Sequence, residues 1–279
     1  MSSFISNPTA ITFASSAPAS VEARHQAALA AAEQCKQILE KEFDATEVIV
    51  FGSLRGDTPW HSRSDLDLAV RGISQDSIWD AYGRLEGIVP GWLSFDLVAI
   101  EKADERVRDR ILKMTPIPEN IFLNTKIRLE DELHAIEKTV GIVQEALAEA
   151  RTASKILLTP ALASYAEDFY SGCERISERV AVNLDDGLPE GESWHQMLLD
   201  QVSEPGRRGR PPLWVDVSLQ DQLEVYRRFR HRVRHLYNTD LNDETVLEMA
   251  RQMATTFEKV KQSVELFNQW LLTQADKSG

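Results

Sequence analysis

The sequence predicts an α+β protein, in which an N-terminal domain with a small sheet and helices precedes an all-α helical bundle. Three observations carry this prediction. The chain has 279 residues, more than a single domain usually contains. Strand patterns occur only before the segment Thr115-Pro-Ile-Pro118, and long helical periodicity fills the chain after it. Since proline interrupts regular structure, we expect domains over residues 21–118 and 119–279, behind a loose tail over residues 1–20.

The N-terminal domain is expected to run helix, strand, strand, helix, strand, helix. Its first helix is Ala-rich, and the strand after it is a β-branched run that ends at Gly52. The second strand alternates polar and apolar residues, which is the periodicity of a strand. Ser74 is the expected N-cap of the second helix. The expected elements are helices over residues 21–43, 74–87 and 103–114, and strands over residues 46–51, 65–70 and 93–100.

The C-terminal domain is expected to be a bundle of five helices with short connections. Pro160 suits the first turn of one helix, and Ser218 is expected to cap another. Asn242 or Asp243 is expected to begin the last helix. Loops that contain glycine and proline separate the middle helices. The expected helices cover residues 124–155, 160–183, 194–202, 218–237 and 243–272.

The charge of the chain is unevenly distributed. Its net charge of −13 argues against a protein that binds nucleic acid non-specifically. Residues 206–235 nevertheless contain eight arginines and only three acidic residues. This basic stretch is either a local site for phosphate or a solvated helix face. The arginines are Arg207, Arg208, Arg210, Arg227, Arg228, Arg230, Arg232 and Arg234.

Cysteine usage and hydropathy bear on the compartment in which the chain folds. Cys35 and Cys173 are isolated thiols that make neither a disulfide framework nor a zinc pattern, which indicates a reducing cytoplasm. No apolar run approaches the ~20 residues that a membrane-spanning helix needs. Residues 1–20 lack the basic start and the apolar stretch of a signal peptide. We therefore expect a cytoplasmic protein that has no membrane partner.

The strongest chemical signal is Gly52-Ser53 at the end of the first strand, followed after eleven residues by Asp65-Leu-Asp67. Gly52 lets the backbone approach a triphosphate, and Ser53 adds a hydroxyl donor. Two carboxylates on one strand face repel each other unless a cation lies between them. Divalent cations take such carboxylates together with phosphate oxygens, so the pattern predicts a magnesium–nucleotide site. Asp96, on the next strand, is expected to share the metal and to deprotonate an acceptor hydroxyl.

Each part of this pattern is common by itself. Asp-x-Asp recurs on exposed strand faces without a function, and Gly-Ser is a weaker signal still. An acidic residue inside Phe95-Asp-Leu-Val is harder to dismiss, because burying an unpaired charge costs several kcal/mol. The order of the three parts on the expected elements favours the nucleotide site.

Residues 48–113 resemble a minimal nucleotidyltransferase of the DNA polymerase β superfamily, similar to the MntA-like antitoxins. Such proteins carry Gly-Ser, a spacer, Asp-x-Asp and a later Asp on a small mixed sheet. The resemblance implies Mg²⁺ as cofactor, with Gly52 and Ser53 at the nucleotide and Asp65, Asp67 and Asp96 at the metal. The spacer of eleven residues is one longer than the commoner form. For that reason no role is carried over to the loop residues His61 and Arg63.

A second motif, Arg-x4-His-x-Tyr, ends the penultimate helix with Arg230, His235 and Tyr237. Arg230 can bind a phosphate through two nitrogens and His235 can exchange a proton near neutral pH, which is sufficient for metal-free RNA cleavage. On a regular helix these two lie about 140° apart, which indicates a composite site at a dimer interface or a distorted helix end. Alone, a histidine in an Arg-rich helix is usually a surface residue. His231 and His235 lack a third ligand of metal type nearby, which disfavours a metal pair.

The surroundings of this motif resemble HEPN-domain toxins of the HepT-like ribonuclease type, over most of residues 126–261. The resembling segments are residues 165–181, 188–191, 194–195 and 229–237. The resemblance implies that Arg230 and His235 are the ribonuclease residues. The usual partner of that family is a minimal nucleotidyltransferase antitoxin, which transfers AMP from ATP to the motif tyrosine, here Tyr237, and so blocks the RNA site. Those partners are normally two proteins, whereas here both halves share one chain.

The sequence thus predicts a self-regulating fusion, in which a Mg²⁺- and ATP-dependent nucleotidyltransferase adenylylates Tyr237 and silences RNA cleavage by the helical domain. ATP and RNA are the expected partners, and a homodimer through the helical domain is expected. Two alternatives stay open. An aminoglycoside-type nucleotidyltransferase would need an acidic pocket for a polycationic substrate, and the arginine cluster speaks against it. A non-catalytic nucleotide- or RNA-binding scaffold would have neither activity.

Overall fold

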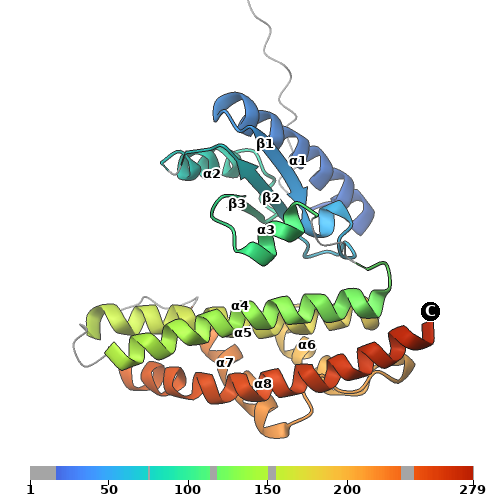
Figure 1. Ribbon diagram of the computed structural model, residues 1–279, viewed down its shortest axis with the longest axis vertical. Helices are drawn as coiled ribbons and strands as arrows, with labels where there is room; N and C mark the ends of the chain where they lie inside the picture. The colour runs from blue at the N-terminus through green and yellow to red at the C-terminus, as the bar shows by residue number, and fades with distance from the viewer. Residues whose placement is uncertain (1–16, 75, 114–117, 150–154, 234–241, 279) are drawn as a thin grey trace, which may run out of the picture. The chain divides into compact units, whose positions relative to one another are not determined.

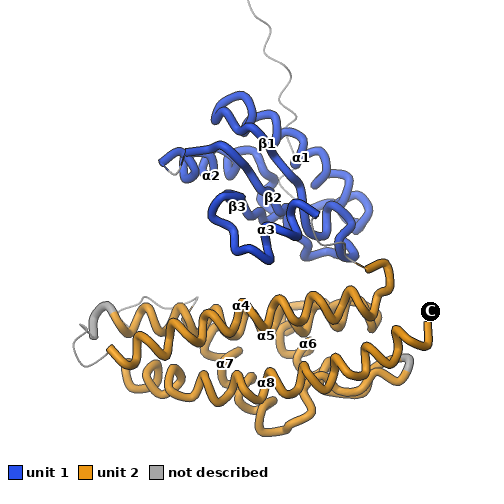
Figure 2. Tube along the Cα trace, in the orientation of Figure 1, with its two compact units in different colours: residues 1–117 blue, residues 118–279 orange. Residues whose placement is uncertain are grey.

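The computed structural model of the chain describes residues 17–74, 76–113, 118–149, 155–233 and 242–278. The chain divides into two compact units, residues 1–117 and 118–279 (Figure 2). In their described residues, the first unit combines a three-stranded sheet with helices, and the second contains helices without a sheet. The predicted α+β class is confirmed. No helix in the described ranges has both the length and the apolar character that crossing a bilayer requires.

The first unit follows the predicted order of helices and strands (Figure 1). Its elements are α1 (Val21–Glu42), β1 (Glu47–Phe51), the 3₁₀ turn η1 (Gly52–Arg55), β2 (Leu66–Arg71), α2 (Ile78–Glu86), β3 (Phe95–Ala99) and α3 (Glu105–Ile111). The strands lie in the order β1-β2-β3. Strand β1 pairs antiparallel with β2, and β2 pairs parallel with β3, so the sheet is mixed, as the resemblance implied.

The two faces of this sheet are covered unequally. On one face, Leu66 and Leu68 of β2 are fully buried in a core that also contains side chains of α1 and α2. The core on the other face is small, with Ala69, Ile100 and Ile111 as its buried members. Because side chains alternate along a strand, the odd-numbered residues of β2 lie on this second, thinly covered face.

Two expected boundaries in this unit differ from the structure. Strand β2 begins at Leu66, so Asp65 immediately precedes the strand and does not belong to it. Helix α2 begins at Ile78 with Ser77 as its N-cap residue, whereas Ser74 was the expected cap. The Ser74 hydroxyl instead lies 2.8 Å from the Ser77 hydroxyl and accepts a hydrogen bond from the Ser77 amide (3.3 Å). Ser74 therefore closes the turn that precedes the helix.

The second unit contains five α-helices in its described residues, as the sequence predicted. Its elements are α4 (Ile121–Glu149), α5 (Lys155–Leu184), α6 (Trp194–Ser203), the 3₁₀ turn η2 (Arg207–Gly209), α7 (Val217–Val233) and α8 (Asp243–Ser278). Helix α4 packs against α5 and α8, and α5 packs against α6, α7 and α8 (Figure 1). All five helices contribute to one core, in which Phe169 and Trp214 are fully buried.

Local side chains set the helix ends in this unit. Pro160 lies inside α5, so its expected place in a first helical turn is wrong; one proline near a helix start removes only one backbone hydrogen bond. Asp216, not Ser218, caps the start of α7, because its carboxylate accepts from the Ser218 amide (2.8 Å). Asn242 accepts from a first-turn amide of α8 (2.9 Å), which confirms one of the two expected starts.

Candidate functional site

The turn after β1 brings the backbone against Asp67. Phe51, the last residue of β1, is the register partner of Asp67 on β2, so Gly52 begins η1 beside that carboxylate. Gly52 has a φ of +72°, and a Cβ at this position would lie 2.0 Å from Oδ2 of Asp67. Only glycine allows this approach without displacing the carboxylate. Ser53 follows in the same turn and is partly exposed.

Two loop residues fix the shape of this turn. Asp57 accepts a hydrogen bond from the Gly52 amide (3.0 Å), and its carboxylate lies 2.7 Å from Nη2 of Arg55. Arg55 also donates to the carbonyl oxygens of Ile111 (2.8 Å) and Arg110 (3.1 Å) at the end of α3. The turn is therefore tied to α3 through one guanidinium. The Arg55-Gly-Asp57 order is visible in the sequence, but no role was assigned to either loop residue from it.

Two of the three predicted acidic residues face each other on neighbouring strands. Asp67 on β2 and Asp96 on β3 are register partners in the parallel pair, so their side chains leave the same, thinly covered face of the sheet. Asp65 lies one residue before β2. Asp65 and Asp96 are exposed, and Asp67 is half-buried. Among the described residues, no three His, Cys, Asp or Glu side chains form a group that could hold a metal ion. The fold thus brings Asp67 and Asp96 together without assembling a three-carboxylate cluster.

The chemistry of these residues fits a divalent cation and a triphosphate. Carboxylate oxygens are ligands that Mg²⁺ takes alongside phosphate oxygens, and Asp67 and Asp96 present carboxylates on adjacent strands. Beside Asp67, Gly52 leaves the space that a Cβ would fill. Ser53 adds a hydroxyl group in the same 3₁₀ turn, next to this space. Asp65 lies two residues before Asp67, outside the strand, and no group of three carboxylates forms here among the described residues.

In the second unit, Arg230 lies in the last turn of α7 and reaches α5. Its Nε donates to Oγ of Ser171 (3.2 Å), and its Nη2 lies 3.5 Å from Oε2 of Glu174. The side chain of Arg230 is only 12% exposed, so its direction is set by these partners. His235 and Tyr237 lie outside the described residues, and the angle between Arg230 and His235 stays a prediction.

Glu174 also binds His195 of α6, a residue with no role assigned from the sequence. Oε1 of Glu174 is hydrogen-bonded to Nδ1 of His195, and the ring of Trp194 stacks on the His195 ring with the centroids 3.7 Å apart. Burial, together with the negative charge of Glu174, raises the pKa of the neighbouring Tyr170. Glu174 falls one position after Cys173, on the apolar face of α5. An acidic residue at such a position is the signal that could have identified this network.

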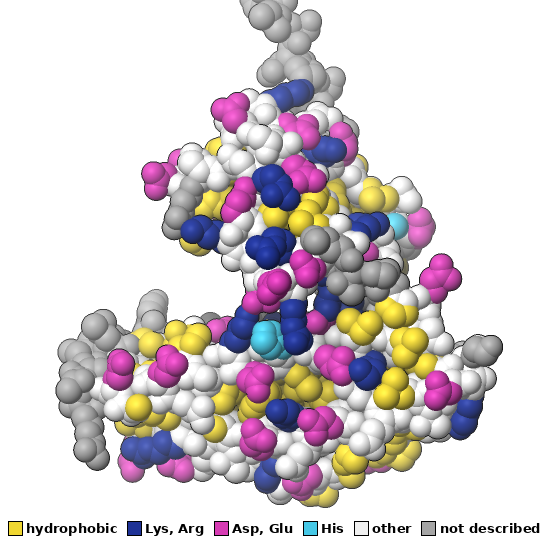
Figure 3. Space-filling view, viewed as in Figure 1, with side chains coloured by type: hydrophobic (Ala, Val, Ile, Leu, Met, Phe, Trp, Pro, Cys, Tyr) yellow, Lys and Arg dark blue, Asp and Glu magenta, His cyan; other side chains and the backbone are white. Residues whose placement is uncertain are grey.

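The arginine-rich stretch is not one continuous basic surface. Among the arginines whose side chains the structure describes, five pair with acidic residues: Arg207 with Asp186, Arg210 with Asp185, Arg227 and Arg228 with Glu224, and Arg230 with Glu174. The hydrogen bond from Arg227, followed by that from Arg228, lowers the pKa of Glu224. On the face shown in Figure 3, acidic and basic side chains are interspersed over both units. Much of the stretch therefore serves local ion pairs, and only part of it is available to phosphate.

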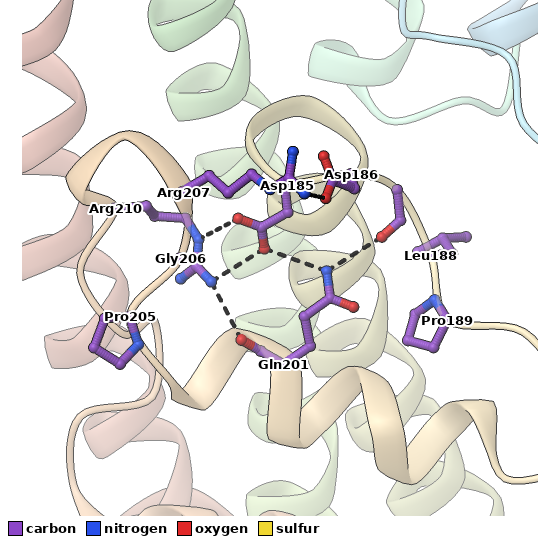
Figure 4. Close-up of a pocket in the computed structure, with 10 residues that line it drawn as sticks. Asp185, Asp186, Leu188, Pro189, Gln201, Pro205, Gly206, Arg207 and Arg210 are labelled. Carbon is purple, nitrogen blue, oxygen red and sulfur yellow. Dashed lines mark hydrogen bonds and ion pairs between the residues drawn. The ribbon is translucent and has the colours of Figure 1, made fainter.

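A cavity of about 550 Å³ lies beside a buried ion pair after α6 (Figure 4). Arg210 is 1% exposed and donates from Nε and Nη2 to the two carboxylate oxygens of Asp185 (2.8 and 3.0 Å). Backbone carbonyls of α6 and the following loop accept its other hydrogen bonds. Because its donors are satisfied within the fold, Arg210 anchors the loop and is not directed at a ligand.

Comparison with protein families matches two segments of the chain. Residues 33–120 match the family described as polymerase beta, nucleotidyltransferase. Residues 161–271 match the family described as HepT-like protein. Both resemblances predicted from the motifs are confirmed. No curated protein and no solved structure matches the chain.

Proposed function

Because the chain joins a polymerase β nucleotidyltransferase domain to a HepT-like domain, we propose that the first domain adenylylates the second and so silences an RNA-cleaving site. One observation carries the proposal: Asp67 and Asp96 are partners on adjacent strands, and the Gly52 turn lies against Asp67. Acidic side chains and close backbone approach are what a site for a metal-bound triphosphate needs.

In the first domain, the proposed roles follow from the chemistry of each side chain. Gly52 and Ser53 bind the triphosphate through the turn and the hydroxyl. Asp65, Asp67 and Asp96 would hold Mg²⁺, which when bound neutralises charge on the phosphate oxygens. Asp96 is exposed, so an acceptor hydroxyl can reach it and give up its proton. The acceptor oxygen then forms a bond to the α-phosphorus of ATP, and pyrophosphate leaves.

The proposed acceptor is Tyr237, seven residues after Arg230. An adenylate on this tyrosine adds bulk and negative charge to the motif, where it competes with RNA phosphate for Arg230. For cleavage itself we propose Arg230 as the phosphate-binding residue and His235 as a proton-transfer residue. Ser171 and Glu174 hold the Arg230 guanidinium in place, which supports its use as a positioned cation.

The transferase proposal is tested by intact-mass spectrometry of the purified chain before and after incubation with Mg²⁺ and ATP. We expect a gain of at least one adenylate, absent from both Asp65→Asn and Tyr237→Phe. Asp80→Asn is a matched control, because Asp80 is an exposed acidic residue in the first turn of α2. A chain that gains no mass under any condition, or a gain that persists in both variants, contradicts the proposal.

RNA cleavage is tested separately on the unmodified and the modified chain. We expect the unmodified chain to cleave RNA at least about 100-fold faster than Arg230→Ala, because the variant loses the cation that binds phosphate. Arg251→Ala, at an exposed arginine of α8 that pairs with Glu248, should cleave at the unaltered rate. Full cleavage by Arg230→Ala contradicts the ribonuclease part and leaves the adenylylation part standing.

The alternatives left open by the sequence receive less support. An aminoglycoside-type enzyme would need an acidic substrate pocket, whereas the match of residues 161–271 to HepT-like proteins supports an RNA-directed helical domain. A scaffold without catalysis would show neither the mass gain nor RNA cleavage.

We further propose that the chain acts in the cytoplasm as a homodimer formed through its helical domain. Cys35 and Cys173 are free, buried thiols, which supports a reducing compartment. Val217 and Val225 of α7 are 68% and 55% exposed, and exposed apolar side chains on one helix support self-association.

A further inference from the structure

Glu174 is a buried carboxylate that joins two side chains of the HepT-like domain. It is 7% exposed, its Oε1 is hydrogen-bonded to Nδ1 of His195, and its Oε2 lies 3.5 Å from Nη2 of Arg230. The three residues come from α5, α6 and α7, which pack against one another. Because a buried carboxylate is costly unless it is paired, both partners are needed where they lie. His195 and Arg230 are thereby held on the two oxygens of one carboxylate.

The ring of His195 is fixed at two points and still reaches solvent. Nδ1 is bound to Glu174, and the plane of Trp194 lies over the ring at an angle of 29°. A histidine held through Nδ1 keeps Nε2 for a substrate, and a carboxylate on Nδ1 fixes the orientation of the ring. The His195 side chain is 27% exposed. A substrate can therefore meet it at the surface.

The inner side of this network is closed to a substrate. Glu174 and His195 line a cavity of about 10 Å³ together with Tyr170 and Ser177. Such a volume has room for about one water molecule. A phosphodiester must therefore approach His195 from its exposed edge.

Metal-free RNA cleavage needs two proton transfers, one from the attacking hydroxyl and one to the leaving oxygen. Arg230 cannot supply either, because its guanidinium stays protonated. Tyr170 is unsuited as well, since it is 3% exposed and burial raises its pKa. His195 is partly exposed, has a ring nitrogen that can carry a proton, and shares a carboxylate with Arg230.

We propose that His195 is a catalytic residue of the RNA-cleaving site, which protonates the leaving oxygen, and that Glu174 is its positioning residue. This inference rests on the proposed ribonuclease function. The ribose 2′-oxygen forms a bond to phosphorus while the bond from phosphorus to the 5′-oxygen breaks. The 2′-hydroxyl proton passes to a base, the role that the motif gives to His235, and Nε2 of His195 gives its proton to the 5′-oxygen. The products are a 2′,3′-cyclic phosphate and a 5′-hydroxyl, so the step needs no oxidant or reductant.

A purely structural role for His195 predicts a different outcome, because loosening α6 would slow every substrate alike. The experiment therefore uses the full-length, unmodified chain and an RNA oligonucleotide with one cleavable linkage in two forms. One form has the natural 5′-oxygen as leaving atom. The other has sulfur there, which leaves as a thiolate without needing a proton. We expect His195→Gln to slow the natural linkage by about 100-fold or more and the sulfur linkage by less than about threefold. Glu174→Gln also releases Arg230, so it should slow both linkages, the natural one more than the sulfur one.

His134→Gln, which alters another histidine of this domain on α4, is the matched control and should cleave both linkages at the unaltered rate. Thermal unfolding establishes that each variant is folded, and His195→Asn replaces His195→Gln if the latter is not. Equal slowing of both linkages, or slowing of neither, in folded variants overturns the proposal. If Arg230→Ala loses cleavage while His195→Gln keeps it, only the role of His195 fails. If the unaltered chain cleaves no RNA, the ribonuclease function fails with it.

Discussion

Gly52 leaves space for Asp67 in the candidate nucleotide site because it has no side chain. Its φ is +72°, and its α-carbon lies so close to Asp67 that a Cβ would collide with the carboxylate. The Gly52 amide also donates to Asp57, which is itself held by Arg55. A single residue is thus constrained by its backbone angle, by a neighbouring strand and by its own loop. The turn is rigid at the point where we expect phosphate to bind.

Replacing Gly52 by alanine should therefore abolish transfer. We expect Gly52→Ala to slow adenylylation at least about 100-fold, because the new Cβ displaces Asp67 from its place. Gly56→Ala is the matched control: it has a φ of +86°, but a Cβ there meets nothing within 4 Å. This control should lower the free energy of unfolding by about 1 kcal/mol and keep most of its transfer activity. Equal transfer rates for the two variants, followed by intact mass, would show that the contact with Asp67 is irrelevant.

The two cysteines should be chemically silent in the folded chain. Burial raises the pKa of Cys35 to about 12, and burial also raises the pKa of Cys173. The thiolate is the reactive form, and its population at pH 8 falls as the pKa rises. We expect iodoacetamide to label both thiols at least about 100-fold more slowly in the native chain than in urea. Labelling of Cys35 should accelerate as the pH rises toward 12, and rapid labelling at pH 8, mapped by peptide mass, would contradict its burial.

At the scale of elements, a buried arginine holds the connection between α6 and α7. Asp185 directly follows α5, and its carboxylate binds Arg210 from the loop. A Cβ on Gly206 would lie 2.3 Å from Nε of Arg210 and 2.5 Å from Oδ1 of Asp185, so the loop crosses directly over this pair. The loop therefore has a fixed course although most of it has no regular structure.

Removing that arginine should destabilise the helical domain strongly. Arg210→Met leaves Asp185, which is 7% exposed, without its cation, and we expect a loss of about 3–5 kcal/mol in the free energy of unfolding. Arg207→Ala is the control, because Arg207 pairs with Asp186 at the surface and should contribute less than about 1 kcal/mol. Urea unfolding measures both. Similar losses in the two variants would mean that burial of the pair does not matter.

The order of helices and strands was predictable because each depends on periodicity within a short segment. Helix ends were less predictable, because several neighbouring residues can cap the same helix. Ser74 and Ser77 both suit the start of α2, and the choice depends on Ala81 and Leu85, which are completely buried in the larger core of this unit. Ser218 was likewise a plausible cap, yet Asp216 accepts its amide. Packing decides which of several suitable polar residues begins the helix.

At the scale of the whole molecule, the two domains have separate cores. The buried residues of both cores of the first domain lie before residue 112. The buried residues of the helical domain's core lie after residue 128. We therefore expect residues 17–117 and 118–279 to fold as separate fragments. Each should show helical circular dichroism and a cooperative thermal transition. A fragment that aggregates or melts without cooperativity would show that its core is incomplete.

The division into two domains also predicts how the covalent link between them affects adenylylation. A mixture of the two fragments at micromolar concentration should adenylylate at least about 100-fold more slowly than the intact chain, because the link raises the effective concentration to about millimolar. The helical fragment alone should cleave RNA whether or not Mg²⁺ and ATP are added. Equal adenylylation by the mixture and the chain would mean that the domains bind each other tightly without the link.

The sequence by itself determined the fold class, the two family resemblances and the residue types at the candidate sites. Periodicity and motif spacing are properties of consecutive residues, so they can be read without knowing how segments meet. Only the tertiary structure decided that Asp67 faces Asp96, that Gly52 touches Asp67, and that Glu174 joins His195 to Arg230. Those contacts join residues far apart in the chain, and they depend on strand register and helix packing, which the local pattern does not specify.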